Sequence, residues 1–314
     1  MPHARIRLIA PSGYAHDPAV MRRGIARLRE AGCTVEGEEV LARTQLRFAG
    51  TAAERAGDLD ALAKLDTLPD VALVTRGGYG AAHLLDRLDY DALRERLAGS
   101  ALALVGHSDF TALQLALYAR SGVRSFAGPL LADLGTEPFP TFTWDHFWRT
   151  LSATPGGAAW AGAGEAEVDV RGPLWGGNLA VLCSLLGTPY FPAVEGGILF
   201  VEDLGEPPYR IERLFYQLHL SGVLGRQRAL VLGDFEHCRP GPRDNGYDLA
   251  AALAELERIA GIPVIRGLPH GHGARQLTLP FGAEAHLHVS GGEATLRFGN
   301  YPHLPAGALR AVAS

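Results

Sequence analysis

The chain has 314 residues, a length that predicts two domains because one hydrophobic core seldom keeps growing through so many residues. A hydrophobic fraction of 47% excludes extended disorder, and a net charge of −5 argues against nucleic-acid binding, which needs a basic face. Lys64 is the single lysine and lies in an ordinary helical pattern, so a P-loop, a Schiff base and a Ser–Lys dyad are not predicted.

The first 130 residues alternate short apolar runs with amphipathic helical patterns. One helix begins at Pro18, and the capping-box pattern of Thr51 and Glu54 begins another. Apolar runs typical of buried parallel strands occur at residues 5–9, 71–75 and 101–105. We therefore expect residues 1–132 to form an α/β N-terminal domain with a parallel sheet, which binds ligands beyond the carboxyl ends of its strands.

The second half of the chain has a different pattern. Residues 133–170 are rich in Pro, Gly and Ala and indicate a linker or crossing segment around one aromatic helix. Residues 171–314 combine helical patterns with apolar strands, and the alternation around the turn at 290–292 predicts a β-hairpin. We expect a mixed C-terminal domain that contains antiparallel strands.

A serine follows directly after the predicted strand at 101–105. In the sequence GHSDF, Ser108 occupies a tight strand-to-helix turn, which presents a hydroxyl at the carboxyl edge of a sheet beside backbone N–H donors. The alternative is a plain helix N-cap, a common place for serine. Phe110 stands where the hydrolase motif G-x-S-x-G requires its second glycine, so an ordinary α/β-hydrolase is not supported.

A glycine-rich turn, TRGGYGAA at residues 75–82, follows the preceding strand. Its adjacent glycines allow the backbone to approach a ligand closely, so an N–H of this turn can bind a carbonyl oxygen. The spacing fits neither a dinucleotide-binding fingerprint nor a P-loop. Because two consecutive strands end in turns suited to an oxyanion, the pair of turns strengthens the catalytic interpretation.

A serine nucleophile needs a base and a group that orients the base. Glu202 lies at the end of the apolar strand ILFVED, either as a functional carboxylate or as the first polar residue beyond the core. Two histidines, His270 and His272, share one Gly/Pro-rich loop. The residues by themselves do not choose between these two histidines.

The histidines also raise a competing hypothesis, a metal site. His270 with His272, and His286 with His288, form two His-x-His pairs, and alternate residues of a strand can share one ion. The second pair lies in the alternating hairpin, however, in a pattern typical of a solvent-facing edge. We therefore expect no metal and no other cofactor.

The cysteines and the apolar runs predict a cytoplasmic protein. Cys33, Cys183 and Cys238 are odd in number and widely spaced, a pattern typical of reduced thiols rather than of disulfides or a Cys-x-x-Cys metal site. The N-terminal apolar stretch is too short for a signal peptide, and no apolar run reaches the roughly 18 residues of a membrane span. We expect neither a membrane nor a nucleic-acid partner.

Five segments together resemble the LD-carboxypeptidases, a family of serine peptidases that includes the microcin C self-immunity proteins. They are TRGGYGAAHLLDRLDY, GHSDFTALQLAL, GPLWGGNLAVLCSLLGTPY, LFVEDLGEPPYRIERLFYQLHLSG and GLPHGHGARQLTLPFGA. The resemblance runs from Ile6 to about Val289 and implies a Rossmann-like N-terminal domain, a C-terminal domain with antiparallel strands, and a Ser–Glu–His triad shared between them. It also implies a homodimer.

The resemblance places the nucleophile on Ser108, the glutamate on Glu202 and the histidine on His272. The family usually has an apolar residue where this chain has His270. The implied oxyanion donors are the backbone N–H groups of Gly78 and Asp109, in the two turns already singled out. No metal takes part in the implied mechanism.

The implied reaction is hydrolysis of the LD-amide bond that releases the terminal D-alanine from cytosolic murein tetrapeptide, a small peptide substrate. One alternative is a microcin C immunity-type peptidase that cleaves a peptide–nucleotide or aminoacyl conjugate, for which any of the four tryptophans could be the platform for a base. Another is an inactive small-molecule-binding relative. For a peptidase, Arg76 either binds a carboxylate of the substrate or pairs with a neighbouring carboxylate of the protein. Trp175 either lines the pocket or packs at the domain interface. The remaining pocket candidates are Asn178 and Glu206.

Overall fold

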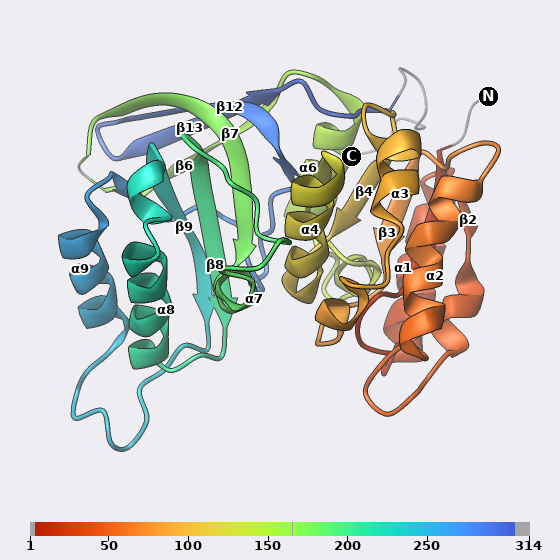
Figure 1. The fold of residues 1–314 in the computed structure, drawn as a ribbon, viewed down its shortest axis with the longest axis horizontal. Coiled ribbons are helices and arrows are strands. Elements are labelled where there is room, and N and C mark those ends of the chain that lie inside the picture. The colour runs from red at the N-terminus through yellow and green to blue at the C-terminus, as the bar shows by residue number, and fades with distance from the viewer. Residues whose placement is uncertain (1–3, 165, 305–314) are drawn as a thin grey trace.

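Two β-sheets lie side by side in the computed structural model, which describes residues 4–164 and 166–304 (Figure 1). The first sheet has six strands in the order β11–β5–β4–β3–β1–β2. Strands β1 to β5 pair in parallel and β11 joins β5 antiparallel. Their bounds are β1 (Arg5–Ile9), β2 (Thr34–Glu36), β3 (Val71–Val74), β4 (Ala103–Gly106), β5 (Ser125–Ala127) and β11 (Leu279–Phe281). The predicted parallel sheet is confirmed.

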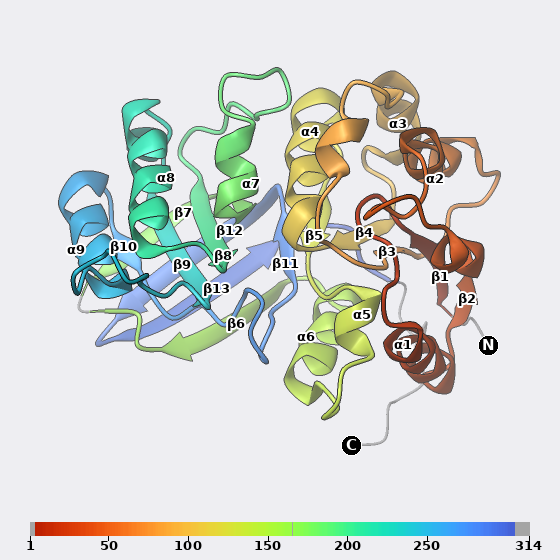
Figure 2. The same cartoon turned by 90° about the horizontal axis from the view of Figure 1, so that it is seen from below.

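Helices cover both faces of the first sheet, as a parallel sheet requires. Helices α1 (Pro18–Glu30), α5 (Leu131–Leu134) and α6 (Thr141–Ser152) lie on one face, and α2 (Ala52–Lys64), α3 (Tyr90–Leu97) and α4 (Thr111–Ser121) lie on the other (Figure 2). Asp17 caps α1 by accepting hydrogen bonds from Ala19 N and Val20 N. The predicted capping box of Thr51 and Glu54 is present at the start of α2.

The second sheet has seven strands in the order β10–β9–β8–β7–β12–β13–β6. Strands β7 to β10 pair in parallel, whereas β12, β13 and β6 continue the sheet antiparallel from β7. The bounds are β6 (Gly156–Ala161), β7 (Val168–Asn178), β8 (Ile198–Leu204), β9 (Ala229–Glu236), β10 (Val264–Ile265), β12 (Ala283–Ser290) and β13 (Glu293–Gly299). Helices α7 (Leu179–Ser184), α8 (Pro208–Leu220) and α9 (Leu249–Ala260) pack on one face. The predicted mixed architecture and the hairpin are thus present.

The segment between the two expected domains is more regular than expected. The segment 133–170 is not a loose linker, because it contains α6, the edge strand β6 and the start of β7. Its Trp160 is buried, and the indole donates a hydrogen bond to Arg266 O at 2.8 Å. The strand β11 crosses back from the C-terminal half into the first sheet, so residues 171–314 do not form a wholly separate unit.

Burial raises the thiol pKa of all three cysteines. Cys33, Cys183 and Cys238 are free and buried, and burial raises the pKa of Cys33 and of Cys183 to about 12. These thiols therefore stay protonated and unreactive at neutral pH. None of the helices in the described part of the chain has both the length and the apolar character that crossing a membrane demands.

Candidate active site at the junction of the two sheets

Ser108 lies in a strained turn at the carboxyl end of β4. The strand ends at Gly106, and a single 3-10 turn over Ser108–Phe110 leads into α4. The φ angle of Ser108 is +60°, a left-handed conformation that costs a non-glycine residue on the order of 1–3 kcal/mol and that clusters at functional sites. Neither the 3-10 turn nor α4 has a side-chain cap. Ser108 is therefore not a helix N-cap, which was the alternative role that the sequence allowed.

The glycine-rich turn after β3 packs directly against this serine. A Cβ on Gly77 would lie 3.0 Å from Ser108 Cβ and 3.2 Å from Ser108 Oγ, so glycine favours this close approach. The next residue, Gly78, has a φ angle of +101°, which favours glycine as well. The sequence prediction that the two turns act together agrees with this packing.

Two buried polar side chains hold the turns in place: that of Asp109, whose backbone N–H is a predicted oxyanion donor, and that of Arg55, which the sequence did not single out. The Asp109 carboxylate accepts hydrogen bonds from Ser12 Oγ at 2.6 Å and from Ala81 N at 2.8 Å. Arg55 is 1% exposed and donates to Pro11 O at 2.7 Å and to Gly80 O at 2.8 Å. Arg55 sits within the helical pattern of α2, so no local signal distinguished it from a surface arginine.

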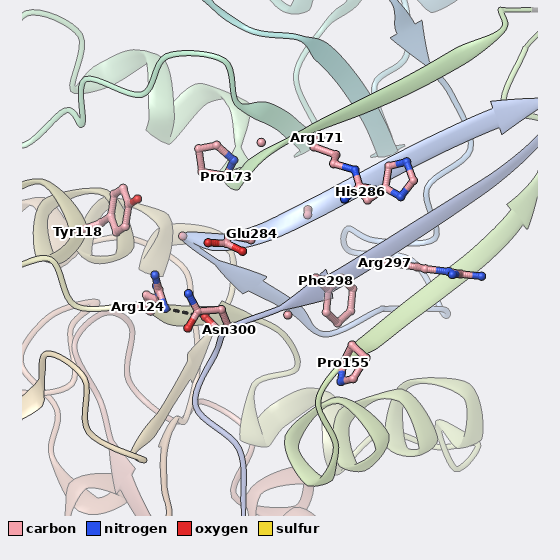
Figure 3. A pocket seen from close by; sticks show the side chains of 14 residues that line it. Tyr118, Arg124, Pro155, Arg171, Pro173, Glu284, His286, Arg297, Phe298 and Asn300 are labelled. Carbon is pink, nitrogen blue, oxygen red and sulfur yellow. Dashed lines mark hydrogen bonds between the residues drawn. The ribbon is translucent and has the colours of Figure 1, made fainter.

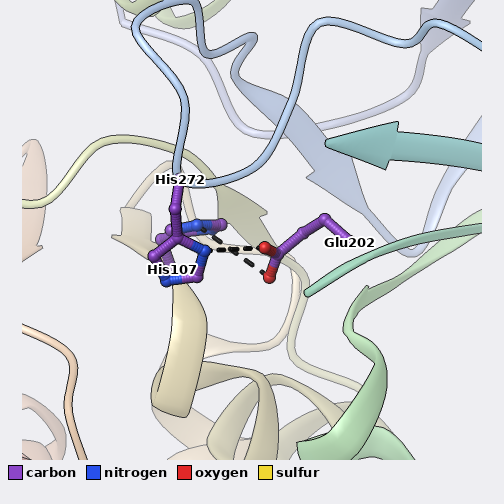
Figure 4. Close-up of side chains that lie close together, drawn as sticks. All are labelled: His107, Glu202 and His272. Atoms are coloured by element: carbon purple, nitrogen blue, oxygen red, sulfur yellow. Dashed lines mark hydrogen bonds and ion pairs between the residues drawn. The ribbon is translucent and has the colours of Figure 1, made fainter. Parts of the chain in front are cut away.

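Glu202 reaches the same place from the second sheet. It lies in β8 next to a register shift and is fully buried, and its Oε2 accepts a hydrogen bond from His272 Nδ1 at 2.8 Å (Figure 4). Asn178, its partner on β7, donates from its side chain to Asp203 Oδ1 at 3.0 Å and from its backbone N–H to Thr111 Oγ1 at 3.0 Å. Asn178 therefore joins α4 of the first sheet to the Glu202 strand of the second.

The two loop histidines have different surroundings. His272 Nδ1 donates to Glu202, whereas His270 is fully buried and its Nδ1 donates to Leu277 O at 2.9 Å. Burial alone would lower the pKa of His272, but the hydrogen bond and the negative charge of Glu202 outweigh burial and raise it. Burial lowers the pKa of His270. Of the two, His272 has the partner that a catalytic base needs.

A third imidazole, that of His107, completes the cluster and had not been singled out in the sequence. Its ring centroid lies 4.6 Å from that of His272, and its Nε2 lies 4.0 Å from Glu202 Oε1 (Figure 4). Burial lowers the pKa of His107 to about 3, so the ring is neutral at physiological pH. Burial would raise the pKa of Glu202, but the neighbouring His107 and the hydrogen bond from His272 keep it lowered.

A cavity of about 400 Å³ opens beside these histidines. Among its lining residues, Asp133 accepts a hydrogen bond from Leu130 N at 2.9 Å, and burial raises the pKa of its carboxyl group. The wall includes His107, Leu130, Asp133, Thr136, Glu137, Phe139, Thr141, Thr143, His272 and Gln276. The cavity gives a small molecule access to the cluster.

The predicted substrate-binding residues divide into two groups. Arg76 is half-buried and has no carboxylate within 4.0 Å among residues 4–164 and 166–304; its nearest polar partner is Tyr14 O at 3.5 Å. Trp175 is fully buried and donates to Gln227 Oε1 at 2.9 Å, and Glu206 pairs with Arg210 at 3.3 Å. None of the four predicted residues, Arg76, Trp175, Asn178 and Glu206, lines the cavity beside His272. Trp175 therefore belongs to the core rather than to a pocket wall.

A larger cavity, of about 650 Å³, lies elsewhere, over strands β7, β12 and β13 (Figure 3). His286 stands between Arg171 and Arg297 across the three strands and lies 2.8 Å from Asp169 Oδ1. The other histidine of this pair, His288, contacts the same carboxylate at 3.4 Å. The hairpin histidines therefore contact one carboxylate, on the more exposed face of their strand.

The chain matches two domain families in order along its length. Residues 6–128 match the LD-carboxypeptidase N-terminal domain, and residues 171–287 match the LD-carboxypeptidase C-terminal domain. The murein tetrapeptide carboxypeptidase of Pseudomonas aeruginosa is 34% identical over 299 residues, which cover 90% of this chain and 92% of the relative. The microcin self-immunity protein MccF of Escherichia coli is 28% identical over 301 residues, 83% of each chain.

A solved structure agrees with these matches. The crystal structure of muramoyltetrapeptide carboxypeptidase from Oxalobacter formigenes superposes with a TM-score of 0.87 at 40% identity, covering 95% of this chain and all of that one. The names of these relatives support a peptidase activity. With both domains matched in order and the fold shared, this chain belongs to the LD-carboxypeptidase family.

Proposed function

We propose that this protein is a serine carboxypeptidase that hydrolyses the LD-amide bond releasing the terminal D-alanine of murein tetrapeptide, a step of peptidoglycan recycling. The observation that carries the proposal is the hydrogen bond between Glu202 and His272 beside the strained turn of Ser108. His107, the residue before Ser108, has its ring 4.6 Å from the His272 ring, and this proximity supports His272 as the base for Ser108. Family membership supports the peptidase class.

In the proposed mechanism His272 acts as general base and Glu202 orients it. His272 Nε2 takes the proton of Ser108 Oγ as the oxygen attacks the scissile carbonyl carbon, and the carboxylate of Glu202 stabilises the imidazolium. The backbone N–H groups of Gly78 and Asp109 bind the oxyanion. His272 then protonates the leaving amine of D-alanine, and water hydrolyses the acyl-enzyme with His272 again as the base.

An unpaired cation supports the choice of an anionic peptide end. Arg76 adjoins Gly77 and Gly78 and lacks a carboxylate partner among the described residues, so it is free to bind the terminal carboxylate of the substrate. Burial lowers the pKa of Arg76, with Arg47 nearby, but the guanidinium stays charged at neutral pH. A carboxylate bound there would offset the desolvation of the arginine.

A microcin C immunity-type reaction on a peptide–nucleotide or aminoacyl conjugate is the second candidate, supported by the similarity to MccF. An aromatic platform for the base of that conjugate would have to be exposed. All four tryptophans are buried, with exposed fractions of 7% or less: Trp144, Trp148, Trp160 and Trp175. This burial argues against a tryptophan as that platform. An inactive binding relative is disfavoured because Glu202 and His272 are kept in contact.

The proposal includes a compartment and an assembly. Murein tetrapeptide that is being recycled is met in the cytoplasm, and the three free, buried thiols are compatible with that reducing compartment. The family resemblance implies a homodimer. Size-exclusion chromatography with light scattering will measure the mass, and a monomer of 33.5 kDa at all concentrations would contradict the assembly.

The test compares D-alanine release from murein tetrapeptide with cleavage of an aminoacyl-nucleotide conjugate. We expect the murein peptide to be preferred and Ser108→Ala to lower kcat by about a million-fold, as loss of a triad serine does. His272→Ala should lose most of the activity, and His270→Ala much less. The surface variant His286→Gln is the control and should keep wild-type turnover. Near wild-type activity in Ser108→Ala would disprove the mechanism, and preference for the conjugate would select the second candidate.

A further inference from the structure

Besides His270 Nε2, two buried polar atoms in the cluster have no hydrogen-bond partner among the described residues. They are His107 Nε2 and Glu202 Oε1, in side chains that are 3% and 0% exposed, and they face each other. A buried polar group without a partner costs about 1–3 kcal/mol. The proposed hydrolysis uses Glu202 Oε2 and His272 only, so it leaves both atoms unexplained.

The spacing of these atoms fits an ion better than a direct hydrogen bond. They are 4.0 Å apart, whereas an N–H···O hydrogen bond spans about 2.7–3.2 Å. Zinc binds imidazole nitrogen and carboxylate oxygen at about 2.0–2.2 Å, so an ion between the two atoms would reach both, and tetrahedral geometry would draw the two atoms closer together. His272 supplies a third donor, since ligand atoms of His107, Glu202 and His272 all lie within 4.8 Å of one another.

We propose that His107, Glu202 and His272 form an inhibitory binding site for Zn²⁺. Two imidazoles and one carboxylate are a donor set that zinc favours and that Mg²⁺ and Ca²⁺, which prefer oxygen ligands, do not. The three ligands come from different segments: the turn after β4, the strand β8 and the loop after β10. The cavity of about 400 Å³ is lined by His107 and His272, so an ion would approach the three ligands from that side.

Bound zinc would prevent His272 from acting as the general base. Glu202 contacts His272 at Nδ1, so an ion among the three ligands binds that nitrogen and replaces the hydrogen bond to Oε2. A neutral imidazole then carries its one proton on Nε2, the atom that has to accept the proton of Ser108. This inhibitory consequence rests on the proposed function, whereas zinc binding itself does not.

Binding is tested first without activity, by titrating ZnCl₂ into the Ser108→Ala protein in a calorimeter. Ser108→Ala retains all three ligands, and we expect one zinc per chain and no heat from MgCl₂. His107→Gln in the Ser108→Ala protein should weaken zinc binding at least about tenfold. Mutation of a residue that only supports a metal ligand already lowers metal affinity about 10- to 100-fold, so loss of a ligand itself should cost at least as much. His286→Gln, which removes a histidine from the exposed hairpin, is the matched control and should leave the affinity unchanged.

Activity is then measured in the protein with Ser108 intact. Zinc should inhibit D-alanine release, and a chelator should restore it. With each protein's rate divided by its own zinc-free rate, His107→Gln should need at least about tenfold more zinc for the same inhibition. Absence of zinc binding to Ser108→Ala, or binding lost with His286→Gln and kept with His107→Gln, would overturn the site. A protein that binds zinc at His107 but releases no D-alanine would keep the site and refute the proposed function. Should His107→Gln unfold, judged by circular dichroism, His107→Phe replaces it.

Discussion

Three imidazoles share the surroundings of one buried carboxylate, and their partners separate their chemistry. His107 is held neutral by burial, with a pKa of about 3. His270 Nδ1 donates a hydrogen bond to the carbonyl oxygen of Leu277, and burial lowers the pKa of His270. His272 alone among the three donates to Glu202, whose hydrogen bond and charge overcome burial and raise its pKa. Its basicity is therefore set by one carboxylate oxygen.

This arrangement predicts the direction of the pH dependence. The base has to be neutral, and its raised pKa means that kcat/KM falls as pH drops through a value above the ordinary 6.5 of histidine. Glu202→Gln removes the charge that raises the pKa, so the acid limb should move to lower pH while kcat falls about 10⁴-fold. Rates between about pH 5 and pH 9 measure both effects. His270→Gln is the control, and an acid limb that Glu202→Gln leaves in place would contradict the role of Glu202.

The two turns that we propose to bind the oxyanion depend on neighbouring elements of the first sheet acting together. The turn after β3 packs closely against the turn after β4 because Gly77 lacks a Cβ, and the Asp109 carboxylate ties both to the loop that contains Ser12. Arg55 reaches the same loops from α2. Rigid hydrogen bonds of this kind are what hold an oxyanion hole in place before the substrate arrives.

Gly77→Ala tests the contact between these two turns. The new methyl group would lie 3.0 Å from Ser108 Cβ, so the serine has to move by a few tenths of an ångström, and misplacement by about 1 Å costs on the order of 100-fold in rate. We expect a loss in kcat/KM of at most about 100-fold, measured by D-alanine release. Gly57→Ala in α2 is the matched control, because its Cβ meets nothing within 4 Å. That control should keep full activity and gain about 0.5–1 kcal/mol in unfolding free energy; equal losses in the two variants would contradict the contact.

At the scale of the molecule the two sheets are joined more closely than two separate domains would be. Strand β11 leaves the C-terminal half to pair with β5, and Phe281 is fully buried with its ring 5.5 Å from that of Tyr118 on α4. The hydrogen bond from Asn178 N to Thr111 Oγ1 adds a second connection. A site made from both sheets needs this joint, because its geometry depends on how they are placed.

We therefore expect the two halves to unfold in a single cooperative transition. Calorimetry should give one peak whose calorimetric and van't Hoff enthalpies agree. Phe281→Ala should lower the unfolding free energy by about 3–5 kcal/mol and shift the whole transition to lower temperature, because both sheets lose the contact. The mutation Leu204→Ala, at an exposed position on β8, is the control and should have little effect. Two resolved transitions, of which Phe281→Ala moves only one, would show that the halves fold independently.

The sequence by itself determined the local elements and much of the chemistry. Pro18 and the Thr51–Glu54 box start their helices as predicted, and Ser108 and the glycine turn stand at strand ends, because these features depend on neighbours in the chain. The crossing of β11 into the first sheet had no local signal, since three apolar residues fit either sheet.

Only the tertiary structure decided which side chains meet. It gave His272 rather than His270 the contact with Glu202, buried Trp175 in the core, and brought His107 to the carboxylate. Loops and strands far apart in the chain set these distances, and spacing along the sequence contains no information about them. Periodicity and capping report the backbone close by, whereas a catalytic contact is a property of packed surfaces from both sheets.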